Sequence, residues 1–414
     1  MERSIAVIDM KAFYASVECH DRGLNPFTTP LAVCDPTRGD GTIVLSVSPY
    51  LKTLGYPSVC RRRDLKDVSD LILAMPRMQK YIEKSAEILS IALDFVGEDD
   101  IHVYSIDEFF VNLGPYLKMY ECTPKQLTQK IQNAIFEKTG LITTAGVSYN
   151  MLLAKVALDC DAKKKPPYIS VWTEKDIKNK LWKITPLSKM WGINVGYERK
   201  LNNLGITTIG QLAHTDKDFM RAKFGVIGEQ LWEHANGIDN TDLREKYIPR
   251  ETSLSIGQVL MRDYSPKEAE LIIKEMNDEL CIRLRAQKQK TSCISLSVMY
   301  TVTEGGGFSH QCKLDFPTDD SELILEDVYR LYRKHVGNHK VRRIMINFSH
   351  LSEEQSLQLS LFEDPKDTIA RNNLQHVIDT LKLKYGKDIV LRASSLLEES
   401  TIKERHQQIG GHRR

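Results

Sequence analysis

Two adjacent carboxylates, Asp107 and Glu108, lie inside an apolar segment that runs from Ile101 to Leu113. The segment is short and rich in β-branched and aromatic residues, which predicts a buried β-strand. A charge inside such a strand is costly unless something compensates it. Neighbouring strand residues point to opposite faces, so a turn or twist is needed before both carboxylates can reach one site. The alternative to a metal site is an ion pair with Lys or Arg at the strand end.

A second apolar segment also ends in a carboxylate. Residues 5–10 are apolar except for Asp9, and residues 12–18 change to helical spacing. A strand that ends in Asp and leads into a helix places that Asp at the rim of a sheet. Two neighbouring strands would then bring Asp9, Asp107 and Glu108 together. Three carboxylates without a Cys or His partner favour Mg²⁺ over Zn²⁺, and they suit a two-metal phosphoryl transfer.

These two segments carry a resemblance to a known family. Asp-Met-Lys-Ala-Phe-Tyr-Ala-Ser-Val-Glu (Asp9 to Glu18) and Tyr-Ser-Ile-Asp-Glu (Tyr104 to Glu108) together closely resemble the Y-family, or translesion, DNA polymerases. Either signature alone would be weak evidence, but the resemblance continues in order to about residue 350. It implies a bacterial, template-directed DNA polymerase that is error-prone, lacks proofreading and acts in DNA-damage tolerance. It also implies two Mg²⁺ ions, held by the three carboxylates and the Met10 carbonyl.

Composition limits the setting in which such an enzyme would work. A chain of 414 residues is expected to form several domains. No apolar run is long enough to cross a membrane, and the start lacks a secretory signal pattern. Eight scattered Cys without a Cys-x-x-Cys pair indicate free thiols in a reducing cytoplasm, and they argue against structural zinc. The net charge of +2 means that any DNA-binding surface must be a local patch.

The periodicity predicts a multidomain α+β chain with two βαββαβ units. In the terms of the resemblance, these are a palm with a ferredoxin-like core and a little finger. A small fingers domain is inserted into the first half of the palm, a helical thumb follows the palm, and a helical tail ends the chain. The expected boundaries are 1–20 and 76–166 for the palm, 21–75 for the fingers, 167–242 for the thumb, 250–350 for the little finger and 351–414 for the tail.

The resemblance assigns the nucleotide contacts near the first signature and in the fingers. Phe13 and Tyr14 follow Asp9, and Tyr14 takes the place of the aromatic that excludes a 2′-hydroxyl. In the fingers, Ser48 is expected to cap a helix whose first turn holds Pro49. Alignment on Gly55 places Lys52 where the family has an Arg on the triphosphate, and Pro49 where it has a Tyr. Lys52 would therefore act as a point charge; the alternative is an exposed helix lysine.

Two further segments follow the second signature. Ser148 is expected to cap the next helix, and Asn150 to tie that helix to the palm. At the far end of the helix, the resemblance places one lysine on the β- and γ-phosphates. Lys163 is our assignment, although Lys164 or Lys165 could serve. A basic helix end favoured by the macrodipole is the alternative.

Two regions are expected to bind DNA. Residues 191–212 predict a helix, a Gly-bounded turn and a helix, and they resemble a helix-hairpin-helix in which Gly192 and Gly196 offer backbone N–H groups to a phosphate. A plain helical hairpin is the alternative. In the little finger, a basic cluster is expected to face the duplex, unless it is simply a solvated helix end. The cluster consists of Arg283, Arg285, Lys288 and Lys290.

The tail contains a short motif, Gln358-Leu359-Ser360-Leu361-Phe362. It resembles the peptide with which bacterial polymerases hold the sliding clamp. Exposed Leu and Phe side chains would anchor in an apolar pocket, and Gln358 would orient them. Alternatively, Leu359, Leu361 and Phe362 pack on the little finger as a terminal strand. The expected partners are therefore primer–template DNA, deoxynucleoside triphosphates and a sliding clamp, and the chain itself is expected to be a monomer.

Two other functions match part of the pattern. A nucleotidyl cyclase shares the palm pattern and the paired carboxylates, but it would not need the helical hairpin or the second α/β unit. A non-catalytic relative that serves as a DNA or clamp adaptor would be expected to lose the acidic residues. All three carboxylates are present, which favours an enzyme.

Overall fold

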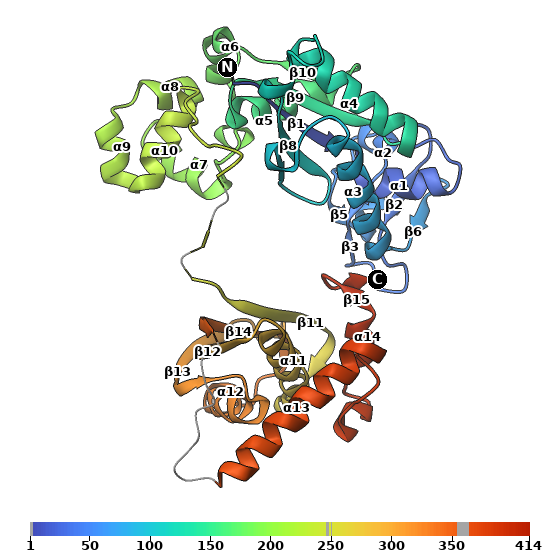
Figure 1. Cartoon of the computed structure of the whole chain (residues 1–414), viewed down its shortest axis with the longest axis vertical. Coiled ribbons are helices and arrows are strands. Elements are labelled where there is room, and N and C mark those ends of the chain that lie inside the picture. Colours follow the sequence, from blue (N-terminus) through green and yellow to red (C-terminus); the bar gives the residue numbers. More distant parts are fainter. Residues whose placement is uncertain (1–2, 246–247, 250, 354–363) are drawn as a thin grey trace. The chain divides into compact units, whose positions relative to one another are not determined.

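The structure is a computed structural model that describes residues 3–245, 248–249, 251–353 and 364–414. It divides into two compact units (Figure 1). The first contains residues 1–246 with 412–414, and the second contains residues 247–411. The division falls within the polar segment expected to link the thumb to the little finger. None of the described helices combines the length and the apolar character that a membrane crossing requires.

The palm is built on a five-stranded sheet with the order β10-β9-β1-β8-β7. β1 (Ile5–Met10) is antiparallel to β8 (Glu108–Asn112) and to β9 (Thr143–Ser148). β7 (Ile101–Val103) lies at one edge, and β10 (Ile169–Val171) pairs in parallel with β9 at the other. Strands β9, β1, β8 and β7 have the ferredoxin-like order that was predicted, and β10 extends it.

Helices cover both faces of the palm sheet, which explains why β1 is apolar along its length. Alternate side chains of β1, such as Ile8, pack with α1 (Phe13–Asp21), α3 (Met78–Leu93) and α4 (Pro124–Thr139). The others, such as Val7, pack against α5 (Met151–Cys160). Because both faces are buried, the strand shows no polar alternation.

The acidic segment is a hairpin, so the prediction of one buried strand over 101–113 was wrong. β7 and β8 are separate strands, and the backbone N–H groups of Tyr104 and Ser105 both donate to the Glu108 carbonyl, each at 3.0 Å. The residues of β7 are at most half-buried, as suits an edge strand. The turn places Asp107 outside the sheet ladder and thereby avoids the cost of burying its charge between strands.

The fingers form two small sheets. β2 (Leu31–Val33) lies between β4 (Ser46–Val47) and β6 (Ile72–Ala74), while β3 (Ile43–Val44) pairs with β5 (Cys60–Arg61). The apolar run of residues 42–47 predicts one strand, but it is divided between the two sheets. Helix α2 (Pro49–Thr53) follows β4 directly.

The thumb is helical. Its helices are α6 (Glu174–Asn179), α7 (Val195–Asn202), α8 (Ile209–His214), α9 (Lys217–Phe224) and α10 (Val226–Ala235). Their core includes Trp172, Leu212 and Leu231, and it is continuous with α5 through residues such as Leu153.

The second unit has the predicted βαββαβ chain order. Its elements are β11 (Leu254–Tyr264), α11 (Pro266–Ala286), β12 (Gln289–Tyr300), β13 (Gly307–Thr318), α12 (Ser321–His335) and β14 (Val341–Glu353). The sheet order is β11-β14-β12-β13, and each neighbouring pair is antiparallel. In this unit the fourth strand, β14, lies between the first two strands, β11 and β12. In the palm the third strand, β8, lies between the first two strands, β1 and β7.

The C-terminal tail is largely helical, as predicted. It contains α13 (Pro365–Tyr385), α14 (Ile402–His406) and the short strands β15 (Gln408–Ile409) and β16 (His412–Arg413). Ion pairs join α13 and α14 to the helices of the little finger. Arg371 pairs with Asp320 at 2.6 Å, and Arg405 pairs with Glu279 at 3.1 Å.

Candidate active site

Strand pairing brings the three predicted carboxylates to one end of the palm sheet. Asp9 lies directly opposite Glu108 in the β1–β8 register. The backbone N–H of Met10 donates to the Asp107 carbonyl at 2.9 Å, so the β7–β8 turn closes onto the end of β1. The arrangement follows from the sequence because Asp9 lies near the end of β1 and Glu108 is the first residue of β8.

Glu108 forms a buried ion pair with a lysine of α5. The Lys155 ammonium lies 2.7 Å from Glu108 Oε1 and 2.8 Å from Oε2, and both side chains are buried. Asp107 is held differently, because the Ser105 hydroxyl donates to its Oδ1 at 2.8 Å. The ion pair that was the alternative to a metal site is therefore present for Glu108.

Asp9 is held by Lys163, the first residue of the predicted lysine run. Lys163 Nζ lies 3.1 Å from Asp9 Oδ2 and 2.9 Å from Asp159 Oδ1. Lys164 and Lys165 are exposed. Of the three lysines, the structure thus places Lys163 beside the carboxylates.

Burial makes two of the carboxyls harder to ionise. Burial raises the pKa of Asp9; Lys163 acts against this, and Asp107 adds to it. Burial likewise raises the pKa of Glu108; Lys155 opposes the shift, and Asp9 reinforces it. Both carboxyls are therefore harder to ionise than usual despite their lysines. A bound cation would favour the ionised forms.

The donor set suits a hard divalent cation, because it consists of carboxylate and carbonyl oxygens. Glu108 Oε1 is buried and lacks a hydrogen bond of good geometry, although the Lys155 ammonium is near. Among the described residues, no three His, Cys, Asp or Glu side chains converge closely enough to enclose an ion as they stand. Holding one would require Asp9 and Glu108 to turn from their lysines.

The predicted sugar gate packs within an aromatic network. Tyr14 is half-buried, and its ring stacks on Tyr81 of α3 with centroids 4.5 Å apart. The Tyr81 hydroxyl donates to the fully buried Glu18 at 2.7 Å. Arg77 also donates to Glu18, at 2.8 Å. The helical spacing of residues 75–95 predicts a core position for Tyr81, and nothing in the sequence relates it to Tyr14.

The fingers place Lys52 near Asp9 and Lys163. The Ser48 side chain accepts from the Leu51 N–H at 3.4 Å, which confirms the predicted cap of α2. Lys52 is exposed, as the alternative expected. The surrounding protein and Lys163 nevertheless lower the pKa of its ammonium, and Asp9 acts against this shift. Lys52 is therefore close enough to Asp9 and Lys163 to interact with both.

The cap of α5 differs from the prediction. Ser148 belongs to β9, and its hydroxyl donates to the Trp172 carbonyl at 2.9 Å. Asn150 is the cap; it accepts from the Leu153 N–H and donates to the Gly237 carbonyl, each at 2.9 Å. Asn150 thus ties the helix to the thumb instead of serving within the palm alone.

The two predicted thumb glycines do not bound one turn. Gly192 lies in the loop before α7 at φ +92°, but Gly196 is the second residue of α7 itself. The turn between α7 and α8 contains Gly205, at φ +79°. The helix, turn and helix predicted over 191–212 therefore exist, with Gly205 in place of Gly196 at the turn.

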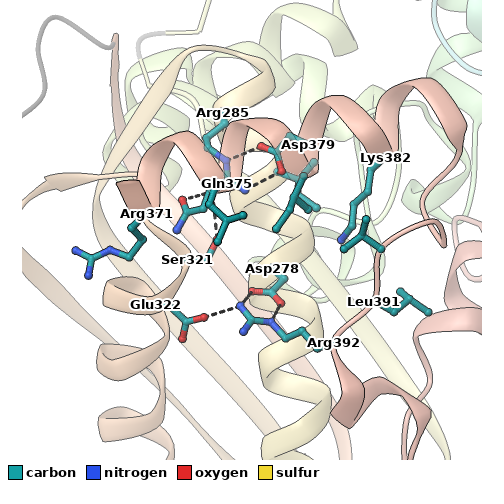
Figure 2. A pocket seen from close by; sticks show the side chains of 14 residues that line it. Asp278, Arg285, Ser321, Glu322, Arg371, Gln375, Asp379, Lys382, Leu391 and Arg392 are labelled. Carbon is teal, nitrogen blue, oxygen red and sulfur yellow. Dashed lines mark hydrogen bonds and ion pairs between the residues drawn. The ribbon is translucent and has the colours of Figure 1, made fainter. Parts of the chain in front are cut away.

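The predicted basic cluster of the little finger does not form one exposed face. The Arg285 side chain is covered by α13, where Asp379 accepts from it at 2.6 Å (Figure 2). Lys290 is buried, and Arg283 pairs with Glu279 at 2.7 Å. Only Lys288 and Arg283 are exposed. The prediction failed because it did not foresee that the tail packs against the end of α11. The clamp motif at 358–362 lies outside the described residues.

A solved structure has the same fold. A Y-family DNA polymerase chimera of Dbh and Dpo4 superposes with a TM-score of 0.68 at 19% identity. The match covers 84% of this chain and 99% of the other.

Sequence comparisons give the class directly. The model of the impB/mucB/samB family matches residues 8–159, and the model of that family's C-terminal domain matches residues 251–361. These findings define the chain as a bacterial Y-family DNA polymerase.

Within that class, the chain belongs to the impB/mucB/samB family. UvrX of Bacillus subtilis (strain 168), provisionally named a UV-damage repair protein, is 37% identical over 99% of this chain and 98% of its own length. DNA polymerase IV 2 of the same organism is 32% identical over 99% of both chains. DNA polymerase IV 2 of Halalkalibacterium halodurans is 31% identical over the full length of both.

Proposed function

We propose that this chain performs template-directed DNA synthesis across damaged templates, with Asp9, Asp107 and Glu108 as the catalytic carboxylates. The activity follows from membership of the family. The observation that carries the residue assignment is the register of β1 and β8, which sets Asp9 opposite Glu108 with Asp107 in the adjoining turn. Neither a cyclase nor an adaptor has an observation in its favour.

Membership of the family implies dependence on a divalent metal. We assign two Mg²⁺ ions to the three carboxylates and the Met10 carbonyl, all of which are oxygen donors. When bound, such ions lower the pKa of the primer 3′-hydroxyl and neutralise the triphosphate. Until then, Lys155 and Lys163 pair with Glu108 and Asp9.

The remaining site residues bind and orient the incoming nucleotide. Lys163 and Lys52 supply positive charge for the triphosphate, which requires Lys163 to exchange Asp9 for phosphate oxygens. Tyr14 lies beneath the sugar, and the buried Phe13 supports it with ring centroids 5.6 Å apart. Ser48 fixes α2 and therefore Lys52.

Duplex DNA is assigned to the thumb and the little finger. Backbone N–H groups at Gly192 and Gly196 are assigned to phosphates, which they would bind without reading sequence. Those from Leu204 to Thr208 already donate within the thumb. In the little finger, Arg283 and Lys288 are the members of the basic cluster that are exposed to solvent. The Arg285 side chain is covered by α13 and Lys290 is buried, so both are better explained as structural.

Clamp binding through residues 358–362 stays a prediction, as do the monomeric state and a cytoplasmic location. A clamp raises the effective concentration of a polymerase at the primer end. Replacing Leu361 and Phe362 together with Ala is expected to remove stimulation by a bacterial clamp and to leave synthesis on a short primer unchanged. Clamp affinity measured by surface plasmon resonance checks this; wild-type affinity in the double variant would contradict it.

The function itself is tested by extension of a labelled primer on a template of known sequence. The purified full chain is supplied with one deoxynucleotide at a time, with and without a divalent metal ion. Addition of the complementary nucleotide is expected only when the metal is present.

A further inference from the structure

Lys11 connects the turn before Tyr14 with the loop that carries Lys163. It follows β1 and precedes Ala12, whose φ of +52° turns the chain into α1 and toward Tyr14. Its ammonium donates to the backbone carbonyl of Lys163 at 3.0 Å. The same ammonium lies 4.3 Å from the ring centroid of Tyr168. One side chain thus spans from the turn before the sugar gate to the loop that carries the triphosphate lysine.

The main chain of Lys11 is fixed as firmly as its side chain. Its N–H donates to the Ile142 carbonyl at 2.9 Å, and its carbonyl accepts from the Ser16 hydroxyl at 2.6 Å. A side chain that starts from a fixed backbone can hold its partner in place with little loss of further freedom. The contact can therefore hold the loop at a fixed position relative to β1.

The Lys11 ammonium lies among other charged groups of the site. Lys11 is half-buried, and the charged side chains that act on its ammonium are Lys52, Lys163 and Asp9. None of the carboxylates in the described ranges forms an ion pair with it within 4.0 Å. Its hydrogen-bond acceptor is the Lys163 carbonyl, and its ammonium lies over the Tyr168 ring.

We propose that Lys11 is a positioning residue, which holds loop 162–168 so that Lys163 meets the triphosphate of a nucleotide whose sugar lies on Tyr14. This inference rests on the roles proposed above for Lys163 and Tyr14. It assigns Lys11 an effect on nucleotide affinity that acts through Lys163 and not through direct contact with phosphate.

The experiment is steady-state single-nucleotide extension with Lys11→Met, Lys11→Arg, Lys163→Met and the Lys11→Met/Lys163→Met double variant. Lys11→Met is expected to raise the KM for the incoming nucleotide about tenfold, as expected for loss of one charged hydrogen bond. The kcat should change by less than about threefold, because the carboxylates are untouched. Lys11→Arg should restore most of the affinity, since a guanidinium can donate to the same carbonyl.

The double variant decides between positioning and direct binding. If Lys11 acts through Lys163, the KM of the double variant equals that of Lys163→Met. Multiplicative effects would overturn the proposal in favour of direct phosphate contact, and an unchanged KM in Lys11→Met would overturn it in favour of a solvated lysine. Lys138→Met, on an exposed pair with Asp94, is the matched control. Wild-type protein that fails to extend any primer would instead contradict the proposed function.

Discussion

Replacing Asp107 with Asn is expected to lower the rate of nucleotide incorporation by about a thousandfold or more, because a charged metal ligand is lost from the transition state. Asn has the same shape and can keep the hydrogen bond from the Ser105 hydroxyl. Removing the Asp107 charge also relieves its repulsion of Asp9, whose pKa Asp107 helps to raise. The variant should therefore fold at least as well as the wild type. Single-turnover kinetics measures the rate.

Controls separate loss of chemistry from loss of binding or fold. Affinity for primer–template DNA, measured by fluorescence anisotropy, should stay within about twofold, because phosphate contacts dominate it. Asp99→Asn removes an exposed carboxylate shortly before β7 and should keep wild-type activity. Asp9→Asn should behave like Asp107→Asn. Wild-type turnover in either variant would rule out the carboxylate assignment.

Tyr14→Ala is expected to raise ribonucleotide use relative to deoxynucleotide use about a hundredfold, which corresponds to about 2.7 kcal/mol of steric exclusion. The ring is held in place by its stack on Tyr81, which in turn donates to the buried Glu18. A ring that cannot retreat excludes a 2′-hydroxyl more strictly than a mobile one. The measurement is the ratio of kcat/KM for the two sugars opposite one template base.

Tyr14→Phe is the matched control, because it keeps the ring and removes only the hydroxyl. It should discriminate between the sugars like the wild type. If Tyr14→Ala also keeps the wild-type ratio, the ring does not lie beneath the sugar, and Tyr14 is simply a packed aromatic beside β1.

Much of the palm could be predicted because local signals agree with the fold. The amphipathic spacing of residues 124–139 predicts a helix, and α4 has the same bounds. Thr123 and Gln126 form a capping box at its start, and Gly140 at φ +69° ends it. The three carboxylates could likewise be grouped, because each lies where a strand begins or ends.

The errors come from contacts that no local pattern records. The β7–β8 turn interrupts an apolar run whose composition is the same on both sides. Arg285 appears exposed in a helix pattern until Asp379, nearly a hundred residues later, covers it. Tyr81 occupies an ordinary core position in α3, and only the folded palm sets its ring on Tyr14. Lys11 likewise gains its partner across 152 residues of sequence.

Primer extension by the purified chain tests the central claim most directly. With Mg²⁺ present, we predict addition of the nucleotide complementary to each template base, no addition in the presence of a chelator, and no shortening of the primer when nucleotides are withheld. Incorporation that does not follow the template, or that is no faster in the wild type than in Asp107→Asn, would contradict a polymerase site at Asp9, Asp107 and Glu108.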